Sequence, residues 1–284
     1  MIAAALVVGA VAWTYGRVVS GLVAEWASSP DASYGLVLAI AAFALLWQRR
    51  HTIRHEFAPS PHPTPGLAVL LSGTALFVVG QLGADLFLTR LSVIVVIVGA
   101  VWLLAGGRAL RTVAAPIGFL AMAVPLPAIL VNTITLPMQL VASRVAESTL
   151  ALAGVPVFRD GNLLVLPSAT LQVAEACSGL RSLVSLTAIA ILLAWMTDTN
   201  ALRRAALAAI ALPIAIVVNG WRIAATGFAC ETFGPRAATG AWHEATGWAA
   251  FVCSLALLGL AQRVFERSTR ATRSEASPSI PATV

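Results

Sequence analysis

The sequence predicts an all-α polytopic membrane protein with about eight transmembrane helices, and three observations lead to this fold class. Of its 284 residues, 59% are hydrophobic and only 11% are charged, whereas a soluble domain carries roughly 25% charged residues. Apolar runs close to the ~20 residues needed to cross a bilayer recur along the chain. Arginines gather in short segments between these runs, where basic residues orient membrane helices. The net charge of +6 is therefore no nucleic-acid signature.

The apolar runs set the expected number of helices. The first run has no positively charged segment before it and no clear cleavage site after it, so we expect a retained span rather than a removed signal peptide. The first, second and fourth runs are short, which leaves seven or nine spans as alternatives to eight. The runs occupy about residues 2–16, 35–48, 66–86, 91–106, 113–131, 178–196, 205–225 and 245–262.

The arginines predict the orientation of the bundle. All 18 basic residues are arginine, and with a cytoplasmic N-terminus eleven of them fall in inner segments. These eleven are Arg49, Arg50, Arg54, Arg108, Arg111, Arg203, Arg204, Arg263, Arg267, Arg270 and Arg273. Both termini are then expected in the cytoplasm, and the stretches 132–176 and 226–243 are expected on the outer face.

The outer stretch is expected to hold an amphipathic helix and a short β-hairpin before the sixth span. From Leu136 to Leu152, apolar residues recur at helical spacing with charged residues between them, which indicates an extracytoplasmic helix in the membrane interface. Within Val155–Val173, the residues Arg159-Asp160-Gly161-Asn162 stand between two short apolar runs. This pattern is typical of a hairpin turn. The hairpin would lie beside Cys177 and could shape a substrate groove.

The chain is expected to form one integral membrane domain over residues 1–262. Beyond Arg263 the sequence is polar and contains Ser277-Pro278 and Pro281. This composition predicts a disordered cytoplasmic tail over residues 263–284.

Three ionisable residues, Cys177, Arg222 and His243, fall at predicted helix ends on the outer side. Cys177 comes just before a helix, where unpaired backbone N–H groups and the helix dipole favour a thiolate. Arg181 follows one turn later on the same face and adds a positive charge. A thiol, a guanidinium and an imidazole in one place can serve as nucleophile, oxyanion clamp and proton carrier. Glu175 lies two residues before the thiol, and Arg181 could instead only neutralise it.

Arg222 ends a strongly apolar run, with Asn219 one turn before it and Thr226 one turn after it. These three residues share a helix face. An ionisable residue at the lip of a span usually faces a partner or a cavity, although a snorkelling arginine that anchors the interface is the alternative. Asn219, a second polar residue deeper in the helix, favours the functional interpretation.

His243 is the only histidine expected on the side of the thiol. The other histidines, His51, His55 and His62, lie in the basic inner loop. A lone interfacial histidine is more often structural than catalytic, so this alternative stays open. Gly247, one turn further, would let another helix approach closely.

The cysteines also leave alternatives. Cys177 could be an inert buried thiol, or it could pair with Cys230 in a disulfide across an oxidising outer face. Cys230 and Cys253 have no comparable surroundings and are expected to be structural. No set of residues has metal-ligand spacing, and neither a phosphate loop nor a nucleotide fingerprint occurs, so neither a metal nor a cofactor is expected.

Glu175-Ala176-Cys177-Ser178-Gly179-Leu180-Arg181, followed by Asn219-x-x-Arg222 and then His243, resembles the exosortase/archaeosortase family of membrane cysteine transpeptidases. The likeness extends over most of the chain from about residue 25 to 255. It includes the segments Glu25-Trp26 to Tyr34-Gly35, Pro125-Leu126-Pro127, Leu136 to Ser143 and the Gly161 hairpin. One departure is Tyr34, where the family often has a histidine.

The resemblance implies that Cys177, Arg222 and His243 are catalytic. From their positions in the sequence, Arg181, Asn219 and Glu175 are expected to support them. It implies a bacterial inner-membrane enzyme that cleaves a C-terminal sorting signal, often Pro-Glu-Pro followed by a membrane helix and a basic cluster, from exported proteins. The exported protein would form a thioester with Cys177 and would then be transferred to an unknown amine acceptor. A non-enzymatic component of export or exopolysaccharide assembly and a purely hydrolytic intramembrane protease are the alternatives. Lipid is an expected partner and nucleic acid is not.

Overall fold

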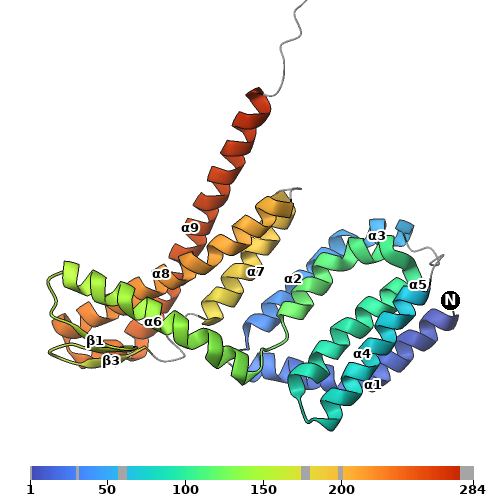
Figure 1. The fold of residues 1–284 in the computed structure, drawn as a ribbon, viewed down its shortest axis with the longest axis horizontal. Coiled ribbons are helices and arrows are strands. Elements are labelled where there is room, and N and C mark those ends of the chain that lie inside the picture. Colours follow the sequence, from blue (N-terminus) through green and yellow to red (C-terminus); the bar gives the residue numbers. More distant parts are fainter. Residues whose placement is uncertain (1, 30–31, 57–62, 174–179, 198–200, 276–284) are drawn as a thin grey trace, which may run out of the picture. The chain divides into compact units, whose positions relative to one another are not determined.

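The computed structural model describes residues 2–29, 32–56, 63–173, 180–197 and 201–275. Figure 1 shows that helices form nearly all of it, with one small sheet. The chain divides into two compact units, Met1–Ala128 and Ile129–Val284. Within the described residues, six helices are long and apolar enough to cross a membrane, and Tyr34–Gln48 and Val184–Ala194 are shorter apolar helices. The predicted all-α polytopic membrane fold is confirmed.

The first unit contains five helices and no strand among its described residues. In chain order they are α1 (Ile2–Ser28), α2 (Tyr34–Gln48), α3 (Arg50–Glu56), α4 (Thr64–Leu82) and α5 (Leu86–Met122). Helix α5 bends sharply at Gly106, whose φ of 82° and ψ of 173° lie outside the helical region. A residue with a side chain rarely adopts such a positive φ, so glycine fits the bend.

The second unit begins with a long helix and a sheet. Its elements are α6 (Ala128–Leu152), β1 (Phe158–Asp160), β2 (Leu163–Val165), β3 (Thr170–Gln172), α7 (Leu180–Thr197), α8 (Ala201–Phe233), the 3-10 helix η2 (Pro235–Ala238) and α9 (Gly240–Glu275). The strands form an antiparallel sheet in the order β1-β2-β3. Gly161 and Asn162 make the two-residue turn between β1 and β2, with Gly161 at φ 60°. The predicted hairpin is confirmed, and β3 adds a third strand.

Several predicted boundaries differ from the observed ones. The runs expected at 91–106 and 113–131 correspond to the two arms of α5 on either side of the bend at Gly106, but the second run is interrupted after Met122. Pro125 and Pro127 explain the interruption, because proline lacks a backbone N–H and restricts the residue before it. Helix α6 therefore begins at Ala128 instead of Leu136. Helix α9 continues past Arg263, where the tail was expected to begin, and residues 276–284 lie outside the described residues.

Glycines bring α4 and α5 into close contact. A methyl group added at Gly66 would lie 2.4 Å from the backbone nitrogen of Leu103, and one at Gly99 would lie 2.4 Å from the backbone nitrogen of Leu70. Gly73 and Gly80 meet Val96 and Thr89 in the same way. In a bilayer, where water drives no burial between helices, such small residues gain packing by letting two backbones approach. These four glycines form what we call the glycine seam.

Polar contacts gather at two ends of the first unit. At one end Arg90 pairs with Glu25, and the indole of Trp26 donates to the carbonyl of Ala123 at 2.9 Å. At the other end Arg49 donates to the carbonyl of Thr112 at 3.2 Å. Helices α1 and α2 and both arms of α5 contribute to these polar contacts. The apolar stretches of the helices between the two polar ends are the parts suited to the hydrocarbon core of a bilayer.

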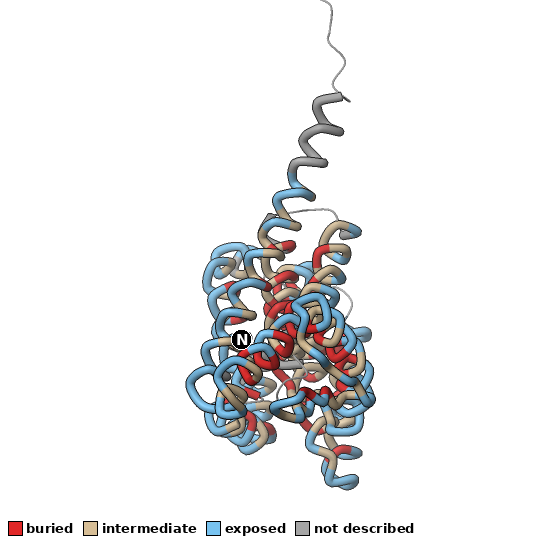
Figure 2. Tube along the Cα trace, turned by 90° about the vertical axis from the view of Figure 1, so that its left-hand side faces the viewer, coloured by how far each residue is buried: buried red, intermediate tan, exposed pale blue. Residues whose placement is uncertain are grey.

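Large apolar side chains are exposed on the helices of both units. Trp13 on α1 is 92% exposed and Trp248 on α9 is 69% exposed. Figure 2 shows exposed residues along much of the helical surface, with buried ones inside. An exposed apolar surface of this extent is costly in water but is the surface that a bilayer covers. It supports a multi-pass membrane protein.

Two apolar cores hold the second unit together. Residues of α6, the sheet and α8 form the first core: Ala142, Ala146, Leu150, Leu164, Leu166, Val173, Ile223 and Ala224. Residues of α7, α8 and α9 form the second: Leu186, Ala190, Ala194, Leu207, Ala211, Ala215 and Leu258. Helix α8 contributes to both cores, so it is the element against which the sheet and the two neighbouring helices are placed.

Candidate functional site

A polar stripe runs along α8 through Asn219, Arg222 and Thr226. Asn219 is only 6% exposed and Thr226 only 9%. The Thr226 hydroxyl donates to the carbonyl of Arg222 at 3.0 Å. Arg222 was expected to close its span, but α8 continues for eleven more residues to Phe233. The stripe therefore lies within the helix and not at its end.

The guanidinium of Arg222 lies against α9. A methyl group at Gly247 would be 3.4 Å from Nη2 and 3.6 Å from Cζ of Arg222, so the absence of a side chain at Gly247 gives the guanidinium its place. His243 lies in the first turn of α9, one turn before Gly247. Positions four residues apart share a helix face. Arg222 thus contacts the face of α9 on which His243 is placed.

Helices α8 and α9 follow each other closely along the chain. Only residues 234–239 separate them, and the two helices pack against each other. The contact at Gly247 is made by the far end of the long Arg222 side chain. It places the guanidinium, rather than the whole polar stripe of α8, beside the 243–247 face of α9.

The start of α7 reaches the same level. Helix α7 has 18 residues, a rise of roughly 27 Å, and only residues 198–200 separate it from α8. The first 18 residues of α8 end at Val218, so Leu180 is level with the beginning of the polar stripe. The shared core of Leu186, Ala190 and α8 residues is consistent with this register.

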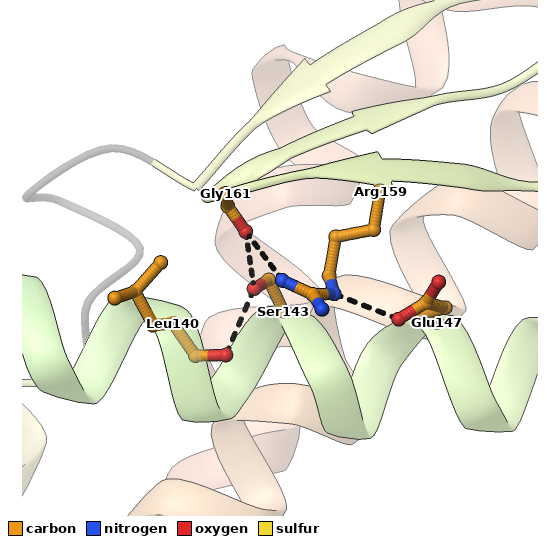
Figure 3. Close-up of polar contacts among 5 residues, drawn as sticks. All are labelled: Leu140, Ser143, Glu147, Arg159 and Gly161. Carbon is orange, nitrogen blue, oxygen red and sulfur yellow. Dashed lines mark hydrogen bonds and ion pairs between the residues drawn. The ribbon is translucent and has the colours of Figure 1, made fainter.

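Hydrogen bonds and an ion pair fix the hairpin to α6 (Figure 3). The Ser143 hydroxyl lies 3.0 Å from the carbonyl oxygens of both Leu140 and Gly161. Nε of Arg159 donates to Glu147 at 2.7 Å, and Nη1 donates to the Gly161 carbonyl at 3.1 Å. Figure 3 shows the Ser143 and Arg159 side chains converging on that carbonyl. The turn is held from the helix below it.

Asn162, in the same turn, links α6 to Val173, the residue that follows β3. Its amide nitrogen lies 3.0 Å from Oε1 of Gln139 and 3.3 Å from the carbonyl of Val173. The backbone N–H of Val173 donates to the Asn162 carbonyl at 2.9 Å. Val173 is the last described residue before Glu175 and Cys177. The Gln139–Asn162–Val173 link therefore fixes the point from which that segment leaves the sheet.

Helix α8 contacts both the segment between β2 and β3 and helix α6. Oε1 of Glu231 accepts from the backbone N–H of Ser168 at 2.9 Å and from its hydroxyl at 2.6 Å. A methyl group at Gly220 would lie 2.6 Å from Cβ of Val145 and 3.0 Å from the carbonyl of Ala142. Helices α6 and α8 thus cross closely beside Asn219 and Arg222.

The predicted site residues stand as follows. Cys177 and Glu175 lie outside the described residues, Arg181 lies in the first turn of α7, and Asn219 and Arg222 lie on the stripe of α8. The structure brings Arg222 to the α9 face of His243. Cys230 is a free, buried thiol, so the alternative of a Cys177–Cys230 disulfide was wrong, and Cys253 is free and exposed.

Sequence reasoning missed the buried polar row on α6. Thr135, Gln139 and Ser143 recur every four residues and are all buried. Among the described residues, the Thr135 hydroxyl has no hydrogen-bond partner. Their spacing was visible in the predicted amphipathic helix, but their partners in the hairpin were not. In the part of the chain that the structure describes, no three His, Cys, Asp or Glu residues group as metal ligands.

The chain matches one known family along most of its length. The family model of the transmembrane exosortases matches residues 26–260. No curated protein and no solved structure matches the chain.

Proposed function

The chain belongs to the transmembrane exosortase family, and from this premise we propose that it is a cysteine transpeptidase acting on exported proteins at the outer face of the bacterial inner membrane. Its substrates would end in a sorting signal of Pro-Glu-Pro type, an apolar helix and a basic cluster. Both termini of the enzyme would lie in the cytoplasm. The observation that carries the proposal is the placement of the Arg222 guanidinium against the His243 face of α9.

Cys177 is the proposed nucleophile. It precedes Leu180 by three residues, and Leu180 is level with Asn219 on α8. Positive charge from Arg181 and the unpaired N–H groups at the start of α7 would favour the thiolate. Glu175 would balance that charge.

The reaction would proceed in two acyl-transfer steps. Sγ of Cys177 adds to the carbonyl carbon of the scissile peptide bond, and the oxyanion lies against the Arg222 guanidinium, which Asn219 helps to hold. The C–N bond then breaks, His243 protonates the departing amine, and a thioester remains on the enzyme. An amine acceptor attacks the thioester, loses its proton, and releases the Cys177 thiol. The exported protein is thereby joined to the acceptor through a new amide bond.

The decisive test compares two cysteine variants in cells that also express a tagged exported protein with such a signal. Cys177→Ala should stay folded in the membrane and lose processing, whereas Cys253→Ser, which changes an exposed thiol on α9, should process normally. Unchanged processing by Cys177→Ala would mean that the nucleophile is not this thiol. It would favour a non-enzymatic role or another protease.

Mass spectrometry of the processed substrate separates transfer from hydrolysis. Transfer leaves the new C-terminus linked to an acceptor amine, whereas a hydrolytic protease leaves a free carboxylate.

The variant Arg222→Lys tests the role of Arg222, since lysine keeps the charge and loses the planar fork of donors. A turnover close to that of the wild type would contradict the clamp by Arg222.

A further inference from the structure

Strand β3 forms one edge of the sheet and leads directly into the segment that carries Cys177. It pairs with β2 on one side, and no strand lies on its other side among the described residues. Gln172, at its end, precedes Cys177 by five residues. Five residues reach at most about 17 Å, so a chain lying along β3 is within reach of the thiol.

Two backbone hydrogen bonds determine which way the backbone groups of β3 point. Val173 donates to Asn162, and Leu166 donates to the carbonyl of Ala169. Together with the register of Leu164 opposite Leu171, these bonds assign Ala169, Leu171 and Val173 to the β2 side. In an antiparallel ladder the alternate residues point the other way. Thr170 and Gln172 therefore direct their N–H and C=O groups away from β2.

The edge of β3 also lacks the usual protection against a further strand. Thr170 and Gln172 are exposed and uncharged, and β3 contains no proline. Natural edge strands are commonly blocked by charges, proline or a bulge. The opposite edge follows this rule, since β1 carries Arg159 and Asp160. The two edges of one sheet thus differ in their readiness to accept a strand.

We propose that the substrate pairs with β3 as a fourth strand, through the stretch of extended peptide next to its scissile bond. Thr170 and Gln172 donate their backbone N–H groups to carbonyls of the peptide and accept from its N–H groups. This main-chain pairing gives affinity with little dependence on side chains. It rests on the proposed function, because the occupant is the peptide whose carbonyl Cys177 attacks. Continuity of β3 with the Cys177 segment selects this peptide over a second copy of the chain.

The first test removes the outward N–H groups. Thr170→Pro and Gln172→Pro delete a donor that does not serve the ladder, and each is compared with Thr170→Ala and Gln172→Ala. Processing of the tagged substrate should fall about three- to tenfold from alanine to proline at each position, the effect of one lost hydrogen bond. Arg159, which points outward on β1, supplies the control pair. Arg159→Pro should process as Arg159→Ala does.

The second test places prolines in the substrate, one position at a time, before the cut site. Pairing along β3 predicts losses that alternate with a period of two, because only every second N–H faces the edge. A photo-crosslinking amino acid at position 170 or 172 of the Cys177→Ala variant should capture the tagged substrate, and one at position 160 should not.

The pairing would be wrong if the ratio of processing by the proline variant to processing by the alanine variant were the same on β1 as on β3. It would also be wrong if the crosslinking residue captured a second copy of the chain instead of the substrate. Failure of Thr170→Pro to accumulate would leave the crosslink and the substrate prolines to decide. These outcomes are separate from the test of the proposed nucleophile, which fails if Cys177→Ala still processes the substrate.

Discussion

In the α4–α5 pair, glycines bring two helix backbones together. In the layer formed by α6, the sheet and α8, side chains instead reach carbonyls and carboxylates across a wider space. The glycine seam contains no charged residue, while Arg159, Glu147 and Glu231 all bind within the layer. The two regions are held together by interactions that suit different surroundings. Hydrocarbon favours close backbone contact, and an aqueous surface permits charge and hydrogen bonding to position a turn.

Filling the glycine seam should have the largest effect. Gly66→Leu would push a side chain into the backbone of Leu103 on the facing helix, which cannot move aside without separating α4 from α5. We expect little folded protein in the membrane, measured as the monodisperse fraction after extraction in detergent. Gly118→Leu is the control, because no atom lies within 4 Å of a methyl group there. Equal accumulation of both variants would show that the seam does not require its glycines.

Filling the space at Gly247 should affect activity more than stability. Gly247→Leu would displace the Arg222 guanidinium from α9, and the loss of one oxyanion donor typically lowers turnover by about a hundredfold or more. Gly259→Leu on the same helix meets no atom within 4 Å and serves as the control. Processing rates and thermal midpoints are measured together. A variant that processes normally would argue that the position of Arg222 is not critical.

Breaking the Gln139–Asn162–Val173 link should have an intermediate effect. Asn162→Ala removes the amide that bonds Gln139 and Val173 and leaves the Gln139 oxygen without that donor. We expect a loss of about 1–3 kcal/mol in the free energy of unfolding, together with slower processing. Asn162→Asp, which keeps the size but not the donor, should resemble it. Full activity in both variants would show that this link is not needed to position the segment that carries Cys177.

The Arg159–Glu147 pair should contribute least. Both side chains are partly exposed, at 22% and 36%, so Glu147→Gln is expected to lower the free energy of unfolding by less than about 1 kcal/mol. The difference from the wild type should shrink further in high salt, because salt screens exposed charges. A loss that persists at high salt would show that Glu147 acts through packing instead of charge.

The fold class and the hairpin could be predicted because they depend on local patterns. Apolar runs and the Gly161-Asn162 turn are visible within short windows of the sequence. Strand β3 was missed because three residues, Thr170–Gln172, offer no alternation long enough to recognise. The end of α8 was placed too early, since Cys230, Glu231 and Thr232 interrupt the apolar run although the helix continues.

The candidate site was predictable only in part, for a related reason. The spacing of Asn219, Arg222 and Thr226 indicated one helix face, and the structure confirms this stripe within α8. The contact of Arg222 with Gly247 depends on how two helices pack, which no local pattern encodes. The partners of Asn162 are likewise remote, since Gln139 lies 23 residues away. Long-range pairing had to come from the structure.

The ion pair between Glu25 and Arg90 has a consequence for how the protein is made. The two residues are 65 positions apart, and Arg90 is the more buried partner. The ribosome therefore delivers the acid on α1 well before the base on α5 exists. During that interval Glu25 lacks its native counter-charge. The native contact between the end of α1 and the start of α5 can therefore form only after α2, α3 and α4 have been made.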